Sequence, residues 1–197
     1  MPVEKQAEII EEMKALKMPI WLSLFSSDEL FIRTYGKPKR HGQTTFKEND
    51  EIYMAMLSNE KPEYFELKGN VIKVQTKDEF ALWAKITNNN ISGGYTDMHP
   101  VYHYPLIEKG LMNCYILYHN NMPVSVAAIM NNKGIVSLEF VATIPEMRRQ
   151  GFAESICNKV VCDTFNDGAK IVTARAVNAL SGKLLEKVGF EAYNYVM

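Results

Sequence analysis

The sequence has few cysteines, no long apolar run and almost no net charge, and each of these absences excludes a class of protein. Its 197 residues include only three cysteines, Cys114, Cys157 and Cys162. None of them stands in a CxxC pair, and an odd number does not indicate a disulfide framework. We therefore expect free thiols and a cytoplasmic location.

Long apolar segments are also missing. No stretch approaches the ~18–20 apolar residues that a membrane-spanning helix needs. Residues 1–17 alternate Glu and Lys with spaced apolar residues, which predicts an amphipathic helix without the apolar core of a signal peptide. The sequence therefore predicts an unexported protein without a membrane partner.

The charges nearly cancel. A formal net charge of −1, from 22 basic and 23 acidic residues, gives no long-range field for a polyanion. A nucleic-acid site would need a local basic patch, and the best clusters are residues 37–41 and the pair Arg148–Arg149. Short basic runs are more often solvated loops than binding surfaces, so we expect no nucleic-acid partner.

Two histidines, His99 and His103, have a spacing that could place metal ligands on one helical face. Pro100 and Pro105 disfavour a regular helix there. We interpret the pair as surface or substrate-loop histidines, and we predict no metal site.

A turn at residues 67–70 is the expected boundary between two regions, residues 1–68 and 69–197. The first region contains the opening helix, a predicted strand over residues 20–25 and polar turns up to residue 50. Residues 52–57 are compatible with a strand or a short helix. This region matches no motif.

The second region begins with a predicted strand at residues 71–74 and a helix over 78–87, opened by Thr76. Apolar runs separated by short polar turns then predict an antiparallel meander. Its strands are residues 114–118, 124–130 and 135–143. A helix over 152–165, a strand over 171–176, a helix over 178–188 and a strand over 190–196 follow. The pattern predicts an α/β (α+β) fold, a mixed and mostly antiparallel sheet flanked by helices with a βαβ crossover.

The loop over residues 143–154 joins a strand to a helix, and its small residues are Gly151 and Ala153. Unpaired N–H groups at a helix start form a concave anion site, and small side chains let an oxygen approach the backbone. A diphosphate would fit there, and Arg148 or Arg149 could add a charge-assisted contact. A single glycine in such a loop is structural in most proteins.

Neighbouring motifs make this loop more informative. The pattern Arg148-x-x-Gly151-x-Ala153 follows a strand end at residues 141–145, and Asn178 and a Gly-Phe turn at 189–190 come later. As a set, these resemble the GNAT N-acetyltransferase superfamily over residues 71–197, whose coenzyme A loop has the pattern Q/R-x-x-G-x-G/A. The resemblance implies an N-acetyltransferase that uses acetyl-CoA as donor, a small-molecule or protein amine as acceptor, and no metal.

The resemblance also implies roles for individual residues. Loop amides would hold the diphosphate, the end of the preceding strand would pair with the pantetheine arm and polarise the acyl carbonyl, and Asn178 would lie beside the arm. Family members commonly bulge this strand, which splays it from its neighbour. The implied cofactor-binding residues are Val141, Ala142, Thr143, Arg148, Arg149, Gln150, Gly151, Phe152, Ala153, Glu154, Asn178 and Ser181. Asn178 has a second, compatible interpretation as a helix N-cap.

An amine nucleophile must lose a proton, and Glu139 is our candidate for the general base. Simple strand alternation predicts a cleft-facing set, Ser137, Glu139, Val141 and Thr143, and an opposite set, Val136, Leu138, Phe140 and Ala142. A carboxylate partly desolvated in a cleft has a raised pKa, as a base near neutral pH requires. The alternative is a solvated glutamate on an exposed sheet face.

The sequence departs from the family at Leu185. Many members carry a Tyr at this position, seven residues after the Asn, as the general acid. Ser181, Tyr193, Tyr195 or solvent would then protonate the thiolate, whose pKa of ~8.5 makes it a tolerable leaving group. Leu185 also motivates an alternative function, a non-catalytic acyl-CoA-binding regulatory module.

Some GNAT proteins carry a degenerate N-terminal half that packs against the catalytic one. We interpret residues 1–68 in this way, as a region that shapes the acceptor site or forms the surface of a homodimer.

Overall fold

The computed structural model describes residues 51–91, 97–132 and 135–196. Every described residue belongs to one compact unit. The helix predicted over residues 1–17, the strand predicted over 20–25 and the turns predicted up to residue 50 lie outside the described residues.

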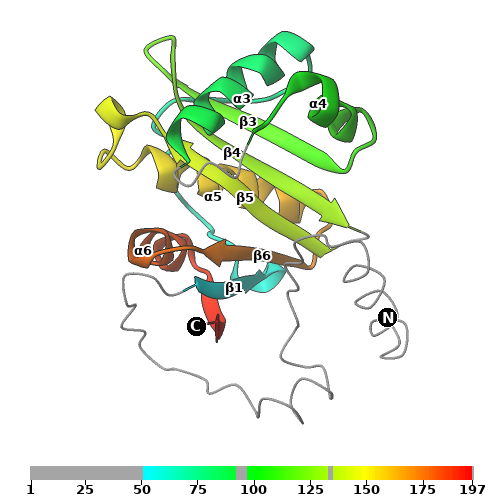
Figure 1. Ribbon diagram of the computed structural model, residues 1–197. Helices are drawn as coiled ribbons and strands as arrows, with labels where there is room; N and C mark the ends of the chain where they lie inside the picture. The colour runs from blue at the N-terminus through cyan, green and yellow to red at the C-terminus, as the bar shows by residue number, and fades with distance from the viewer. Residues whose placement is uncertain (1–50, 92–96, 133–134, 197) are drawn as a thin grey trace. The chain divides into compact units, whose positions relative to one another are not determined.

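A seven-stranded sheet in the order β2-β3-β4-β5-β6-β1-β7 is the centre of the described unit (Figure 1). All pairings among these strands are antiparallel except that of β5 with β6. The strands are β1 (Glu51–Leu57), β2 (Asn70–Lys73), β3 (Met112–His119), β4 (Met122–Asn132), β5 (Ile135–Thr143), β6 (Ile171–Ala176) and β7 (Glu191–Val196). The predicted mixed, mostly antiparallel sheet is confirmed.

Strand β1 resolves an ambiguity of the sequence, because residues 52–57 were compatible with a strand or a short helix. It is a strand, and it lies between β6 and β7. Its register runs from Ile52 opposite Ala176 to Leu57 opposite Ile171. The segment therefore contributes a strand to the sheet although it precedes the boundary expected at residue 69.

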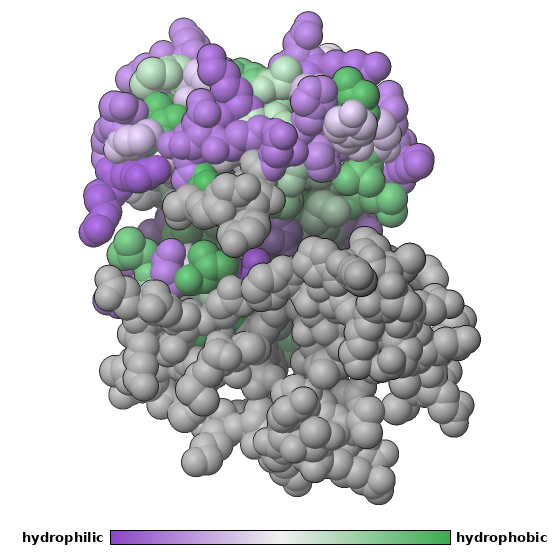
Figure 2. Space-filling view, viewed as in Figure 1, coloured by the Kyte–Doolittle hydropathy of each residue, from purple (hydrophilic) through white to green (hydrophobic). Residues whose placement is uncertain are grey.

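The helices cover both faces of the sheet. Their bounds are α3 (Lys77–Asn90), α4 (Pro100–Glu108), α5 (Phe152–Asn166) and α6 (Ala179–Val188), with 3-10 turns η1 (Ser58–Glu60) and η2 (Pro145–Met147). Helices α3 and α4 pack on one face of β3–β5, and α5 packs on the other (Figure 1). The outer surface over α3 and α4 is mainly hydrophilic, as an amphipathic helix requires (Figure 2). No helix among the described residues is both long enough and apolar enough to cross a bilayer.

Two apolar clusters hold these layers together. The α5 cluster includes Phe152, Ile156 and Val160 of α5 with Val136 and Leu138 of β5. The α3 cluster is more aromatic and is built around Phe80, Trp83 and Tyr104, with ring centroids 5.5 and 5.9 Å from that of Phe80. The Trp83 indole also donates to the carbonyl of Ala127 on β4 at 3.0 Å. Burying each such side chain contributes about 1.5–3 kcal/mol.

Helix α4 corrects our expectation that its prolines disfavour a regular helix. Pro100 is the first helical residue, where a missing N–H has no cost, so that only Pro105 interrupts the hydrogen bonding. His99 caps the helix through its Nδ1, which accepts from the N–H of Val101 at 3.2 Å, and Nδ1 of His103 accepts from the N–H of His99 at 3.0 Å. Within the described ranges, no three His, Cys, Asp or Glu side chains converge on a metal-sized site.

Candidate active site: a cleft between β5, α5 and α6

Strand β5 separates from β6 halfway along its length. Residues 135–138 pair with residues 171–174 in parallel register, and the described pairing stops there. On the other side, Val126 faces Ala142 and Ala128 faces Glu139, so β5 has one extra residue across this stretch. Phe140 takes up the extra length with a φ of 53°, which is rare for a bulky side chain. The bulge turns the end of β5 away from β6 and opens a slot between the two strands.

The same bulge makes our predicted alternation of β5 wrong. Val136 and Leu138 belong to the α5 cluster, but Phe140 and Ala142 pack in the α3 cluster. Val141, expected on the opposite face from Val136, packs against the α5 cluster instead. One extra residue reverses the side-chain period of two, so every position after it changes face.

Buried Ser125 holds the splayed end of β5 against β4. Its hydroxyl donates to the carbonyl of Ala142 at 2.9 Å and lies 2.9 Å from the hydroxyl of Thr143. The splayed end of β5 is therefore held on the side that faces β4.

The loop before α5 presents a row of free N–H groups. Arg149 and Gly151 both have left-handed backbones, with φ of 63° and 84°, and no side chain caps the helix. The first helical bond runs from the N–H of Ser155 to the carbonyl of Gly151 at 3.0 Å. None of the six N–H groups of residues 149–154 donates to an acceptor in the described part of the chain. Such a row at the positive end of a helix dipole is an anion site.

The slot and the loop open into one cleft of about 960 Å³. Eleven of the predicted site residues line it: Val141, Ala142, Thr143, Arg148, Arg149, Gly151, Phe152, Ala153, Glu154, Asn178 and Ser181. Gln150 and Glu139 do not. The amide of Gln150 turns away and donates to the carbonyl of Glu146 at 3.2 Å.

Sequence reasoning missed lining residues from three further parts of the chain. The end of α3 contributes Asn89, Asn90 and Ile91, and η2 contributes Met147. Helix α6 contributes Leu180, Lys183, Leu184 and Lys187, which have the spacing of one helical face. The periodicity of the α6 residues was visible in the sequence. The position of the end of α3 beside the cleft was not.

Basic side chains predominate in the cleft. Arg148, Arg149, Lys183 and Lys187 line it together with the single carboxylate of Glu154, which lies 3.9 Å from the ammonium of Lys187. The guanidinium of Arg148 also links two walls, because its Nε donates to the carbonyl of Thr143 at 3.0 Å and its Nη2 to Oδ1 of Asn90 at 3.4 Å. The cleft suits a polyanion.

Asn178 caps α6, as its second interpretation required. Its Oδ1 accepts from the N–H of Ser181 at 2.9 Å, and the Ser181 hydroxyl accepts in return from the N–H of Asn178 at 3.1 Å. That hydroxyl also donates to the carbonyl of Asn178 at 2.9 Å, so its proton is committed to the cap. The amide nitrogen of Asn178 has no hydrogen-bond partner in the described residues and remains available in the cleft.

Glu139 lies at the last paired position before the bulge, outside the cleft lining. Burial raises the pKa of its carboxyl, while a hydrogen bond from Ser137 and the charge of Arg175 oppose this shift. Its pKa is thus displaced in the direction that a base requires.

Leu185 is buried in the α5 cluster and does not line the cleft. The structure describes the backbone of Tyr193 and Tyr195 in β7 but not their side chains, so their candidacy as acids lies outside the described residues. Burial raises the pKa of Cys157 to about 12 and also raises that of Cys114, consistent with packing roles for both thiols.

Comparison with known proteins supports the same fold. Residues 117–197 match the family model of FR47-like proteins. A GCN5-related N-acetyltransferase from Kribbella flavida is similar in structure, with a TM-score of 0.59 and 16% identity over 77% of this chain and 57% of that one. One from Sphaerobacter thermophilus has a TM-score of 0.60 and 15% identity over 98% of this chain and 64% of that one.

A third similar structure is a putative GNAT-family acetyltransferase from Novosphingobium aromaticivorans, with a TM-score of 0.56 and 14% identity over 81% of this chain and 68% of that one. The chain thus spans less than two thirds of the Kribbella and Sphaerobacter proteins. No curated protein matches its sequence. The structural matches confirm the predicted fold.

Proposed function

We propose that this chain, which has the fold of the GNAT N-acetyltransferases, binds acetyl-CoA in the cleft and transfers the acetyl group to a primary amine. The observation that carries the proposal is the row of six unpartnered N–H groups at residues 149–154, placed beside a strand that has left its neighbour. The N–H groups suit a diphosphate, and the unpaired strand suits an extended arm that contains amides.

The binding residues follow from this arrangement. The N–H groups of residues 149–154 would hold the diphosphate, with Arg149 adding a charge-assisted contact. The slot-facing peptide groups of residues 141–143 would pair with the amides of the pantetheine arm, in the manner of an added strand. The free amide nitrogen of Asn178 would donate to the arm from α6. A cleft of about 960 Å³ is at the upper end for small-molecule sites and suits a long cosubstrate.

The reaction would be a direct attack of the amine nitrogen on the thioester carbonyl carbon. The carbonyl π electrons move to oxygen, and a slot-facing N–H of β5 donates to the oxyanion, a contribution on the order of 3 kcal/mol. Collapse expels the CoA thiolate, which takes a proton from solvent, and the nitrogen loses a proton to Glu139 through one water. The products are an acetamide and free CoA.

The buried Leu185 supports a second candidate, a non-catalytic module that binds acyl-CoA and signals its level. No side-chain acid stands at that position, and the Ser181 hydroxyl is committed to the cap of α6. The cytoplasmic location, the lack of a nucleic-acid partner and the homodimer stay predictions.

The test is calorimetric titration of the full chain with CoA and acetyl-CoA, followed by an assay for free thiol across a panel of primary amines. Amine-dependent thiol release would support the enzyme. Saturable binding without thiol release would favour the regulatory module. If neither CoA nor acetyl-CoA binds, both functions are refuted.

A further inference from the structure

Lys68, from the segment before β2, lies directly behind the loop that presents the free N–H groups. Its ammonium donates to the carbonyl of Gln150 at 2.8 Å. A Cβ on Gly151 would lie 3.0 Å from that nitrogen and 3.1 Å from Cε of the same side chain. Lys68 therefore fills the space where any other residue at position 151 would place its side chain, and it is not among the residues that line the cleft.

We propose that Lys68 is a positioning residue for the diphosphate site: its ammonium holds the peptide between Gln150 and Gly151 so that the Gly151 N–H points into the cleft. The carbonyl and N–H of a planar trans peptide point in opposite directions. A carbonyl held toward Lys68 on one side therefore directs the N–H to the other side, where Gly151 lines the cleft. This inference rests on the proposed binding of a CoA diphosphate.

The backbone of Lys68 is itself anchored, so the side chain starts from a fixed position beside the loop. Its N–H donates to the buried hydroxyl of Ser155 at 3.0 Å, and its carbonyl lies 3.0 Å from Nδ1 of His119. The ring of His119 packs on that of Phe152 with centroids 4.9 Å apart. Lys68 is thus tied to β3 and to the first turn of α5.

Gly69 makes this close approach feasible. A Cβ at position 69 would collide with the carbonyl oxygen of Tyr118 on β3, so only glycine lets the chain run this close to the strand. Gly69 therefore allows the neighbouring Lys68 to lie close enough to β3 to be anchored there.

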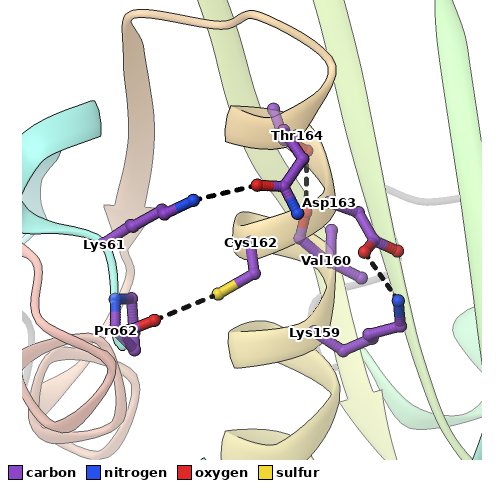
Figure 3. Close-up of polar contacts among 8 residues, drawn as sticks. Lys61, Pro62, Lys159, Val160, Cys162, Asp163 and Thr164 are labelled. Atoms are coloured by element: carbon purple, nitrogen blue, oxygen red, sulfur yellow. Dashed lines mark hydrogen bonds and ion pairs between the residues drawn. The ribbon is translucent and has the colours of Figure 1, made fainter. Parts of the chain in front are cut away.

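A matched lysine is available at the far end of the same helix. Lys61 donates to Oδ1 of Asn166 at 2.9 Å near the C-terminus of α5, where Cys162 also contacts the carbonyl of Pro62 (Figure 3). Each lysine holds the segment before β2 by one exposed ammonium, but Lys61 binds the end of α5 whereas Lys68 binds the loop before it.

The test compares CoA binding by the full-length wild type with that of Lys68→Met, Lys68→Arg and Lys61→Met, by calorimetry. Loss of a charge-assisted hydrogen bond that orients a ligand donor should weaken CoA binding roughly tenfold in Lys68→Met. Lys68→Arg, which keeps a charged donor, and Lys61→Met should bind within about twofold of wild type. The Gly151 amide resonance of ¹⁵N-labelled protein should shift in unliganded Lys68→Met and not in Lys61→Met.

The outcomes separate this inference from the proposed function. Wild type that fails to bind CoA refutes the function itself. Wild type that binds, with Lys68→Met binding equally well or with an unmoved Gly151 resonance, refutes the role of Lys68. Equal weakening in Lys68→Met and Lys68→Arg, with a lowered unfolding temperature in both, would show a packing role and would also refute it.

Discussion

The described unit contains two strand-to-helix connections that meet at one cleft, and they are built in opposite ways. Strand β6 pairs with β1 without an irregularity and leads into α6, whose first turn is satisfied by Asn178 and Ser181. Strand β5 carries a bulge at Phe140 and leads into α5, whose first turn has a glycine cap and no side-chain partner.

The difference shows that an uncapped helix start gains N–H donors for a ligand at the expense of stability. A capped helix start is worth about 1 kcal/mol to stability, and the N–H groups that a cap occupies are lost to a ligand. The β5–α5 connection omits the cap and accepts a strained backbone at Phe140 and Arg149. The β6–α6 connection keeps its cap and contributes a stable wall.

The largest expected effect comes from closing the open helix start. A side chain at position 151 would start in the space that Lys68 fills, so Gly151→Glu should displace the Lys68 ammonium from the Gln150 carbonyl and bring a carboxylate close to the loop N–H groups. CoA affinity measured by calorimetry should fall by at least roughly 100-fold. Gly110→Glu is the control, because Gly110 also has a positive φ, 68°, but lies in open space at the end of α4. Both substitutions put a non-glycine residue into a left-handed backbone conformation, which destabilises each variant by about 1–2 kcal/mol. A folded Gly151→Glu protein that binds CoA normally would contradict the assigned site.

Substitution of Glu139 on β5 tests whether this strand also supplies the general base of the proposed reaction. Glu139→Gln should lower turnover roughly 100-fold and remove the acidic limb of the pH–rate profile, while CoA affinity stays unchanged. Glu108→Gln, an exposed glutamate at the end of α4, is the control. Unaltered kinetics in Glu139→Gln would end the assignment.

The raised pKa of Glu139 also predicts a pH effect on stability that does not depend on activity. The native state holds this proton more tightly than the unfolded state, so the contribution is full below about pH 4.5 and is lost as pH rises through the raised pKa. Glu139→Gln should therefore gain stability relative to wild type as pH rises across that window. Thermal unfolding from pH 4 to 8 checks the sign, and a gain at low pH instead would contradict it.

Substitutions of Asn178 separate its capping role from its binding role. Asn178→Ala should lower the free energy of unfolding by about 1 kcal/mol, whereas Asn178→Asp keeps the acceptor that caps α6. Both remove the amide donor, so both should weaken CoA binding several-fold if Asn178 donates to the pantetheine arm. Thr76→Ala removes the equivalent cap of α3 and should cost similar stability with normal affinity. Normal affinity in Asn178→Asp would leave capping as the sole role.

The smallest effect is expected at Arg149, an exposed residue with a left-handed backbone. Arg149→Gly should raise the free energy of unfolding by about 1 kcal/mol and lower CoA affinity roughly two- to fivefold, less at high salt. Asn121→Gly relieves a similar φ of 62° far from the loop in sequence and should not alter affinity. An unchanged affinity in Arg149→Gly would exclude a contact with the diphosphate.

Much of the fold was predictable because its signals are local. Apolar runs between short polar turns predicted β3, β4 and β5, and Thr76 predicted the start of α3. The placement of β1 between β6 and β7 was not predictable, because pairing between residues 51–57 and the C-terminal strands has no local signature. Pro105 was misleading, since one lost hydrogen bond did not prevent α4.

The candidate site also has parts that the sequence predicted and parts that it did not. The loop around Gly151 was recognisable because a positive-φ glycine before an amphipathic helix leaves a trace in the sequence. The orientation of Glu139 was not, because alternation assumes a regular strand and Phe140 breaks it.

The amino-acid sequence by itself determined the strand and helix segments, the glycine that leaves α5 uncapped and the Asn–Ser pair that caps α6, since each depends on neighbours within a few positions. Only the tertiary structure decided where β5 leaves β6, that Glu139 stands outside the cleft, and that Lys68 reaches the loop across 82 positions of sequence to Gln150. Strand pairing and side-chain reach depend on which distant segments fold against each other, and local propensity does not encode that.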